Sequence, residues 1–227
     1  MLVTAPFAGP VSFPLLVAKV YGKLDFELRN SCEYQGIGDV VLDSVTNVTK
    51  IGVNYKLVAG VYVDMYSLLG NKESKRIYTV RQGTLADYNA RLYALLTGKE
   101  VVNTTPERAV EESERGGLAL VGIEVRVGES FEEEMGRLGV LAPPCVIYAR
   151  EGADNVIKAY EEGIRIIREE PKTSVSIISS ASKYYSLEIM ERIIHIYKHR
   201  LTTSREELKK SVEVYSRVLP AVGRLSY

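Results

Sequence analysis

Polar side chains gather directly after the short apolar stretch Val40–Leu42. Asp43, Ser44, Thr46 and Asn47 supply a carboxyl, two hydroxyls and an amide. Groups of this kind orient a small ligand in an otherwise apolar pocket. The same residue types also favour turns and helix caps, so the pattern alone leaves both interpretations open. We take these four residues as candidates for ligand binding.

More candidates surround the loop that follows the first apolar stretch of the chain. Thr4 and Ser12 flank this loop, and Phe7 within it could stack on a flat ligand or simply pack inside the loop. Glu124 is a charge at the end of a later apolar stretch, where it could face a ligand. We include all four residues in the predicted ligand-binding set.

Gly83 and Thr84 stand where a predicted strand passes into a predicted helix. The N–H groups at the start of a helix attract carboxylate or phosphate groups. The other interpretation is an ordinary helix cap by Thr84, with Asp87 completing the capping box. The two roles are compatible, and we keep Gly83 and Thr84 as ligand-binding candidates. Two cations, Arg81 and Arg126, could pair with a ligand carboxylate, but they fit surface positions better.

The sequence contains no arrangement typical of catalysis or of a bound cofactor. It has no G-x-S-x-G elbow, no Walker loop and no G-x-G-x-x-G fingerprint. His195 and His199 are spaced i, i+4 on a predicted helix, which suits a metal ion, but the glutamate of the zinc-protease pattern is missing. Cys32 and Cys145 belong to no metal-binding cluster. We therefore predict no metal, no cofactor and two unpaired cysteines, and the catalytic residues of any enzyme activity stay unknown.

Composition narrows the class of partner. Lys plus Arg equals Asp plus Glu at 29 each, so the chain has no net charge and lacks the basic excess typical of nucleic-acid binders. No stretch reaches the ~18 apolar residues of a membrane span, and no signal peptide is evident. We expect a cytoplasmic protein whose partner is a small molecule, an anion included. The high content of Glu, Lys and Arg is compatible with a thermophile.

Strands and helices are predicted to alternate along most of the chain. Such alternation favours an α/β fold built from parallel βαβ units, and in open sheets of this kind ligands bind beyond the carboxyl ends of the strands. The predicted strands are residues 2–5, 24–28, 40–42, 56–66, 77–81, 101–102, 118–125 and 145–149. The predicted helices begin near residues 12, 84, 105, 130, 154, 186 and 204, and those from 154, 186 and 204 run to about 169, 200 and 219.

Several short stretches in this order resemble a known family. They include F-P-L-L-V-A at residues 13–18, Y-G-K-L at 21–24, G-D-V-V-L-D-S-V-T-N at 38–47, R-I-Y-T-V-R-Q-G-T at 76–84 and N-V-I-K-A-Y at 155–160. Together they resemble type II periplasmic binding proteins, especially those for taurine, nitrate and pyrimidine precursors. The nearest resemblance is to an archaeal family of unknown function related to solute-binding lipoproteins. The resemblance extends to about residue 170.

This resemblance implies a two-lobed α/β fold in which mixed, mostly parallel sheets are flanked by helices and a ligand cleft lies between the lobes. Lobe 1 would comprise residues 1–80 and 150–227, and lobe 2 residues 81–149. The implied function is binding of a solute by closure of the lobes. Exported relatives carry a signal peptide or a lipid-anchored cysteine, which this sequence lacks. The alternatives are therefore a cytoplasmic enzyme of the menaquinone-pathway or pyrimidine-synthase kind, or an intracellular effector-sensing domain. The ligand's identity and the oligomeric state stay open.

Overall fold

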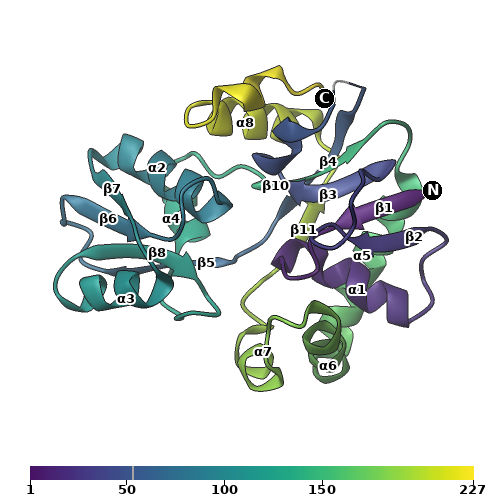
Figure 1. Cartoon of the computed structure of the whole chain (residues 1–227), viewed down its shortest axis with the longest axis horizontal. Coiled ribbons are helices and arrows are strands. Elements are labelled where there is room, and N and C mark those ends of the chain that lie inside the picture. Colours follow the sequence, from purple (N-terminus) through teal and green to yellow (C-terminus); the bar gives the residue numbers. More distant parts are fainter. Residues whose placement is uncertain (53) are drawn as a thin grey trace. The chain divides into compact units, whose positions relative to one another are not determined.

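The computed structural model describes residues 1–52 and 54–227. The chain forms two compact units. In Figure 1 the chain is coloured by position in the sequence. Unit 1 comprises Met1–Val63, Ala142–Glu213 and Ala221–Tyr227. Unit 2 comprises Asp64–Leu141 and Val214–Pro220. The first crossing therefore lies at 63/64 and the return at 141/142, where we expected 80/81 and 149/150.

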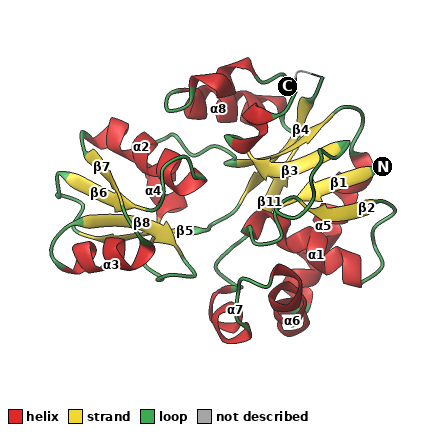
Figure 2. Cartoon of the chain, in the orientation of Figure 1, coloured by secondary structure: helices red, strands yellow, loops and turns green. Residues whose placement is uncertain are grey.

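Unit 1 is built on a six-stranded mixed sheet (Figure 2). Strands β1, β2 and β3 run parallel, whereas β10 is antiparallel to both β3 and β4, and β11 is antiparallel to β4. In sheet order the strands are β11 (Arg200–Thr202), β4 (Lys56–Tyr62), β10 (Cys145–Ala149), β3 (Val40–Ser44), β1 (Leu2–Ala5) and β2 (Glu27–Asn30). The central strands β1, β3 and β10 are almost wholly buried, because helices and connecting segments cover them.

Helices of unit 1 bury one apolar face each. In α5 the buried residues include Val156, Ala159, Gly163 and Ile166, which recur every three or four positions and form one side of a helix. This side packs on α1, where Gly163 approaches the backbone of Pro14 closely. The helices of this unit are α1 (Phe13–Val20), α5 (Asp154–Glu169), α6 (Pro171–Ser182), α7 (Leu187–Ile193) and most of α8 (Arg205–Ser216), with short 3-10 turns η1 (Pro10–Ser12), η2 (Asn47–Lys50) and η3 (Pro220–Arg224).

Unit 2 contains a five-stranded mixed sheet. Strand β6 runs parallel to β7 and β8, and β5 runs antiparallel to β8 and β9. The order is β7 (Glu100–Asn103), β6 (Arg76–Thr79), β8 (Leu118–Gly122), β5 (Tyr66–Gly70) and β9 (Glu129–Ser130), and the helices are α2 (Leu85–Thr97), α3 (Pro106–Glu114) and α4 (Phe131–Arg137). The predicted α/β fold with sheets flanked by helices is therefore confirmed. No helix among residues 1–52 and 54–227 has the length and apolarity to cross a membrane.

Two predicted elements differ from the structure, and other elements were missed. The predicted strand 56–66 is two strands, β4 and β5, in different sheets. The predicted helix 186–200 ends at Ile193, so His195 and His199 lie in the segment that leads to β11. Helix α6 and strand β11 were not predicted at all. Pro171 ends α5, as expected, but it also occupies the first turn of α6, where its missing N–H costs little.

Among the described residues neither cysteine forms a disulfide, and the two differ in accessibility. Cys32 is exposed, whereas Cys145 is buried in β10. We expect one thiol to react rapidly with a thiol reagent in the native protein and a second only on unfolding. Stopped-flow titration before and after addition of denaturant measures both. Two rapid thiols in the native state, or none after unfolding, would contradict this assignment.

Candidate functional site

Parallel pairing brings the carboxyl ends of β1, β2 and β3 to one edge of the first sheet. Two of the predicted segments follow strands at this edge: the loop after β1, and the polar residues at the end of β3. Turn η1 also lies against β3. The carboxyl edge of the first sheet is therefore the place where the candidates of unit 1 gather.

Hydrogen bonds from side chains hold the loop after β1 in place. Ser12 is fully buried, and its hydroxyl donates to the carbonyl oxygen of Pro6 at 2.7 Å. The backbone N–H of Phe7 donates to Oδ1 of Asn30, at the end of β2, at 3.2 Å. Thr4 is buried within β1. Ser12 thus shapes the loop from inside, and its role in ligand binding stays a prediction, as does that of Thr4.

Three side chains from later in the sequence form hydrogen bonds to backbone carbonyls of the same loop. The hydroxyl of Tyr160 donates to the carbonyl of Val11 at 2.7 Å, and that of Tyr185 donates to the carbonyl of Ala8 at 2.9 Å. Nε2 of His199 lies 2.7 Å from the carbonyl oxygen of Pro10. Sequence reasoning missed these contacts, because they join residues at least 149 positions apart.

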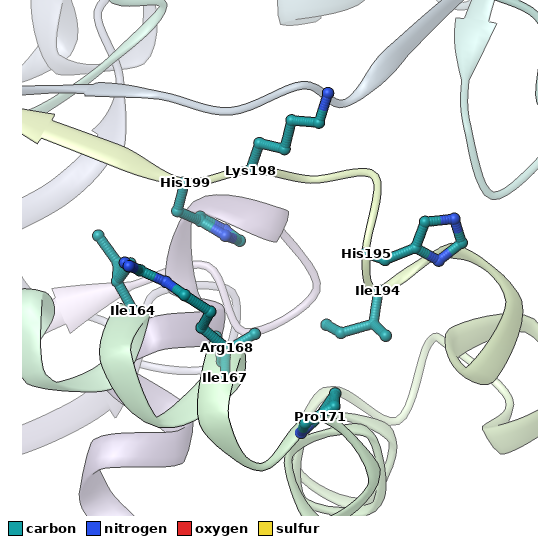
Figure 3. Close-up of a pocket in the computed structure, with 8 residues that line it drawn as sticks. All are labelled: Ile164, Ile167, Arg168, Pro171, Ile194, His195, Lys198 and His199. Atoms are coloured by element: carbon teal, nitrogen blue, oxygen red, sulfur yellow. The ribbon is translucent and has the colours of Figure 1, made fainter.

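The imidazole of His199 is a neutral donor. Burial lowers its pKa to about 4, so the ring carries no charge at neutral pH. A carbonyl oxygen only accepts, so Nε2 carries the proton that is donated to Pro10. Figure 3 shows the ring turned toward the purple loop. Because a peptide group is planar and trans, the N–H of Val11 points the opposite way from the carbonyl of Pro10. The N–H of Val11 therefore points away from His199, within the turn η1 that precedes α1.

The polar residues after β3 form a compact hydrogen-bonded turn. The hydroxyls of Ser44 and Thr46 lie 3.0 Å apart, and both residues are buried. The Ser44 hydroxyl also accepts the backbone N–H of Asn47 at 3.1 Å. The exposed Asn47 amide donates to Oδ1 of Asp43 at 3.0 Å, which leaves its second N–H available. Burial raises the pKa of Asp43, while the Asn47 amide opposes this effect. Asn47 is consequently the member of this group that can reach a ligand most directly.

In unit 2, the predicted anion site at the start of α2 is occupied by a side chain of the protein. The backbone N–H of Gly83 donates to Oδ2 of Asp87 at 2.9 Å. The N–H of Asp87 donates to the hydroxyl of Thr84, which is the helix cap. The side chains of Arg91 and Asn103 also donate hydrogen bonds to the carboxylate of Asp87. Capping accounts for the conformation of Gly83 and Thr84, and a ligand-binding role for them stays a prediction.

Glu124 lies two residues beyond β8, and its carboxyl group folds back over Gly122. Burial raises its pKa. Arg126 pairs with Glu114 at 2.6 Å, and Arg81 is exposed, which agrees with the surface positions expected for both. The role of Glu124 as a ligand contact stays a prediction.

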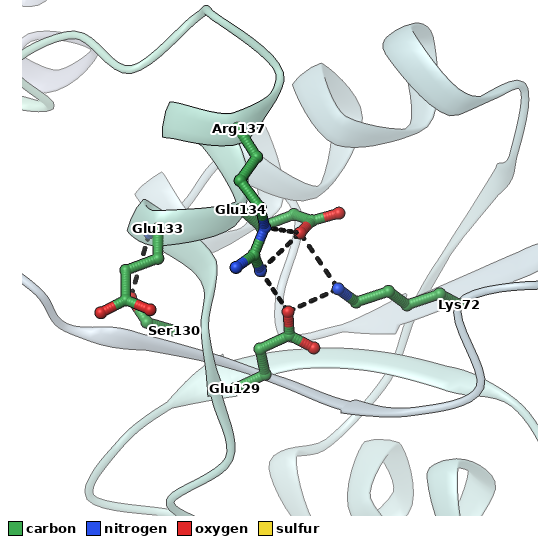
Figure 4. Close-up of polar contacts among 6 residues, drawn as sticks. All are labelled: Lys72, Glu129, Ser130, Glu133, Glu134 and Arg137. Atoms are coloured by element: carbon green, nitrogen blue, oxygen red, sulfur yellow. Dashed lines mark hydrogen bonds and ion pairs between the residues drawn. The ribbon is translucent and has the colours of Figure 1, made fainter.

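The acidic run 132–134 at the start of α4 serves structure in three different ways (Figure 4). Glu134 joins a charge network with Lys72, Glu129 and Arg137, which ties the turn after β5 to β9 and α4. The backbone of Glu133 donates to the capping hydroxyl of Ser130 at 3.1 Å. Glu132 is buried. This cluster holds unit 2 together rather than forming a site.

A charged group at the end of β4 was not predicted. The guanidinium of Arg200 lies over the ring of Tyr62, 3.9 Å from its centre, and pairs with Glu207 at 2.9 Å. The hydroxyl of Tyr62 donates to Glu207 at 2.8 Å, and Thr202 donates to the same carboxylate. Arg200 lowers the pKa of Glu207 to about 2, and burial raises that of Tyr62 to about 12. Both groups therefore keep their ordinary charge at neutral pH.

Comparison with known proteins assigns the family. A model described as "Protein of unknown function (DUF3834)" matches residues 1–200. The chain belongs to this DUF3834 family. No curated protein matches it. A protein from Thermoplasma volcanium, provisionally described as a nitrate transport protein, is 45% identical, with a TM-score of 0.95, over 100% of this chain and 95% of its own.

Two more distant structures share the fold of this DUF3834 protein. The periplasmic aliphatic sulphonate binding protein SsuA of Escherichia coli has a TM-score of 0.70 at 9% identity, over 96% of this chain and 90% of its own. The desulfurization enzyme DszB has a TM-score of 0.52 at 12% identity, over 99% and 93%. The predicted resemblance to type II periplasmic binding proteins is thereby confirmed. Among the described residues, no cluster of three or more His, Cys, Asp or Glu is placed to hold a metal ion.

Proposed function

We propose that this DUF3834 protein binds a small organic anion at the carboxyl edge of the first sheet, with the loop after β1 and Asn47 as its main contacts. The observation that carries the proposal is the anchoring of this loop. Tyr185, His199 and Tyr160 engage the carbonyls of Ala8, Pro10 and Val11 from within unit 1. The N–H of Val11, on the opposite side of the peptide from the Pro10 carbonyl, lies in the turn before α1, near the positive end of that helix dipole, which favours an anion.

The chemistry of the neighbours agrees with an anionic ligand. SsuA is an aliphatic sulphonate binding protein, and the Thermoplasma volcanium protein is provisionally described as a nitrate transport protein. Sulphonate, nitrate and carboxylate groups all accept hydrogen bonds through several oxygen atoms. A backbone N–H and the free amide hydrogen of Asn47 are donors that such oxygens can share.

A panel of small anions tests this proposal. Ethanesulphonate and acetate should raise the melting temperature or give heat in calorimetry, because a ligand that binds only the folded state stabilises it, whereas the cation ethylammonium should not. If none of the anions binds at millimolar concentration, the proposed function is wrong. Chemical conversion of a bound compound would identify an enzyme on this fold, which is the second candidate.

Asn47→Ala should weaken binding of the best anion by about tenfold, the loss expected when one hydrogen bond to a charged group is removed. The matched control is Asn155→Ala, because Asn155 is also exposed and also donates to a carboxylate, Asp25, at 2.6 Å. The control should bind with unchanged affinity. Equal affinities for both variants and the wild type would contradict the role of Asn47. Closure of two lobes and a cytoplasmic location stay predictions.

A further inference from the structure

Unit 1 contains a cavity of about 490 Å³ that none of the predicted site residues lines (Figure 3). Its walls come from α5, from the first residue of α6 and from residues 194–199, which connect α7 to β11. A volume of several hundred Å³ is typical of sites for small molecules. The lining residues are Ile164, Ile167, Arg168, Pro171, Ile194, His195, Lys198 and His199.

The middle of the cavity is apolar. Ile164 and Ile167 are three positions apart on α5 and therefore share one side of the helix. This side differs from the one that carries Gly163 and Ile166 and packs in the core. Both isoleucines are only half-buried, although apolar side chains are favoured inside. Ile194 faces them across the cavity in Figure 3. These side chains offer contact to a short hydrocarbon chain.

The edge of the cavity carries only positive or neutral polar groups. In Figure 3 the guanidinium of Arg168 lies beside Ile164, whereas the amine of Lys198 and the ring of His195 point away from the isoleucines. No acidic residue lines the cavity. Within residues 1–52 and 54–227, neither Arg168 nor Lys198 forms an ion pair.

Three acidic groups in α5 and just after it are engaged elsewhere. Glu162 and Glu169 both pair with Arg165, and Glu170 accepts the hydroxyl of Tyr21 at 2.6 Å. Arg168 lies in the last turn of α5, where the helix dipole alone favours a cation. The dipole does not explain a second uncompensated cation, Lys198, on a different segment at the same cavity.

The segment that carries Lys198 is held rigidly. Lys198 has a φ of 41°, in the left-handed region that non-glycine residues rarely adopt. On one side of it, Tyr197 is fully buried with its ring edge-on to Phe13, 5.1 Å between centres. On the other side, His199 is hydrogen-bonded to Pro10. Unfavourable backbone conformations of this kind tend to occur where a ligand is bound.

We propose that this cavity binds an amphipathic anion, a short aliphatic chain with one carboxylate or similar head group. The chain lies on Ile164, Ile167 and Ile194. Arg168 binds the head group, since guanidinium holds such a group through paired hydrogen bonds, and Lys198 adds positive charge at the edge of the cavity. This ligand differs from the one proposed for the carboxyl edge of the first sheet (the strand-edge site), because it requires an apolar tail.

Calorimetry with octanoate tests the proposal on the full chain. Octanoate should bind, whereas acetate lacks the tail, and octanol and octylamine lack the negative charge, so all three should bind at least about tenfold more weakly. Arg168→Glu should weaken octanoate binding about tenfold or more by repulsion. The control Arg224→Glu makes the same charge change at an exposed position outside the cavity and should leave affinity unchanged.

Two results would overturn the proposal. One is octanoate affinity that is equal in Arg168→Glu and the wild type, or matched by octylamine. The other is octanoate binding that Asn47→Ala abolishes while Arg168→Glu leaves it intact, which would place the molecule at the strand edge. Failure of the small-anion panel leaves the octanoate result unaffected, so the two proposals are tested separately. Circular dichroism of each variant confirms that it folds.

Discussion

Replacing Glu132 by glutamine should reverse the sign of its effect on stability between pH 5 and pH 8. Burial raises the pKa of Glu132 to about 8 from an ordinary value of 4.5, and the negative charge of Asp64 adds to this. The folded protein therefore holds a proton that the unfolded chain releases above its lower pKa. Stability is full below pH 4.5 and falls by about 1.4 kcal/mol per pH unit as the pH rises toward 8.

The surroundings of the carboxyl group explain this shift. Oε1 of Glu132 accepts the backbone N–H groups of Met65, at 2.9 Å, and Tyr66, at 3.2 Å, at the start of β5. Oε2 is buried without a hydrogen-bond partner among the described residues, so it is the atom that carries the proton. Glutamine keeps the accepting oxygen and never ionises. Its buried amide hydrogens lack partners, however, at a cost of about 1–3 kcal/mol.

These opposing effects give a testable pattern. At pH 5, where Glu132 is protonated, Glu132→Gln should be no more stable than the wild type. At pH 8 it should be more stable by about 2 kcal/mol, because the wild type has lost most of its several kcal/mol of protonation-linked stability. Urea unfolding from pH 5 to pH 9 measures this difference. The exposed neighbour Glu133→Gln is the control, and its stability should follow the wild type throughout. If the free energy of unfolding changed equally with pH in Glu132→Gln and the wild type, the raised pKa of Glu132 would be contradicted.

Local signals in the sequence located the helix starts well. Thr84, Thr105 and Ser130 each accept a backbone N–H three residues later, as their capping patterns predict. A cap is a contact between neighbours in the chain, so the sequence contains both partners within four residues. The alternation of strands and helices was predictable for the same reason, and the family resemblance depended on the order of such elements.

Contacts between distant residues were not predictable in this way. Ile194 and Tyr197 are three positions apart and continue the apolar pattern of α7, so a helix through His199 was a reasonable prediction. The structure ends the helix at Ile193 because Tyr197 packs on Phe13 and His199 bonds Pro10, 189 residues away. Tertiary contacts outweigh the weak preference of a few residues for the helix.

The candidate site also combines local features that the sequence reveals with distant contacts that it does not reveal. The polar residues after β3 and the loop after β1 were found because their types and their place beyond strand ends are visible in the sequence. The support from Tyr160, Tyr185 and His199 was invisible, since their partners are backbone carbonyls that any residue could provide. At Gly83, the sequence could not decide whether an outside anion or Asp87 occupies the helix start, because both satisfy the same N–H group.

Gly163→Ala should destabilise the protein by about 3 kcal/mol or more, although alanine is the better helix former. A methyl group at this position of α5 would lie 2.0 Å from the carbonyl oxygen of Pro14 and 2.5 Å from its carbonyl carbon. Both are backbone atoms in the first turn of α1, so no side-chain rotation relieves the overlap. The two helices must move apart, and the packing between them is lost.

The same substitution in α4 provides the control. At Gly136 the nearest atom to an added methyl group is Cδ2 of Leu141 at 3.9 Å, an ordinary contact. Gly136→Ala should therefore be neutral or stabilise by up to about 1 kcal/mol, through helix propensity alone. Urea unfolding of both variants measures the difference. Because α1 follows directly from the loop after β1, Gly163→Ala should also weaken binding at the strand edge, whereas Gly136→Ala should not. Wild-type stability in Gly163→Ala would contradict the close approach of α1 and α5.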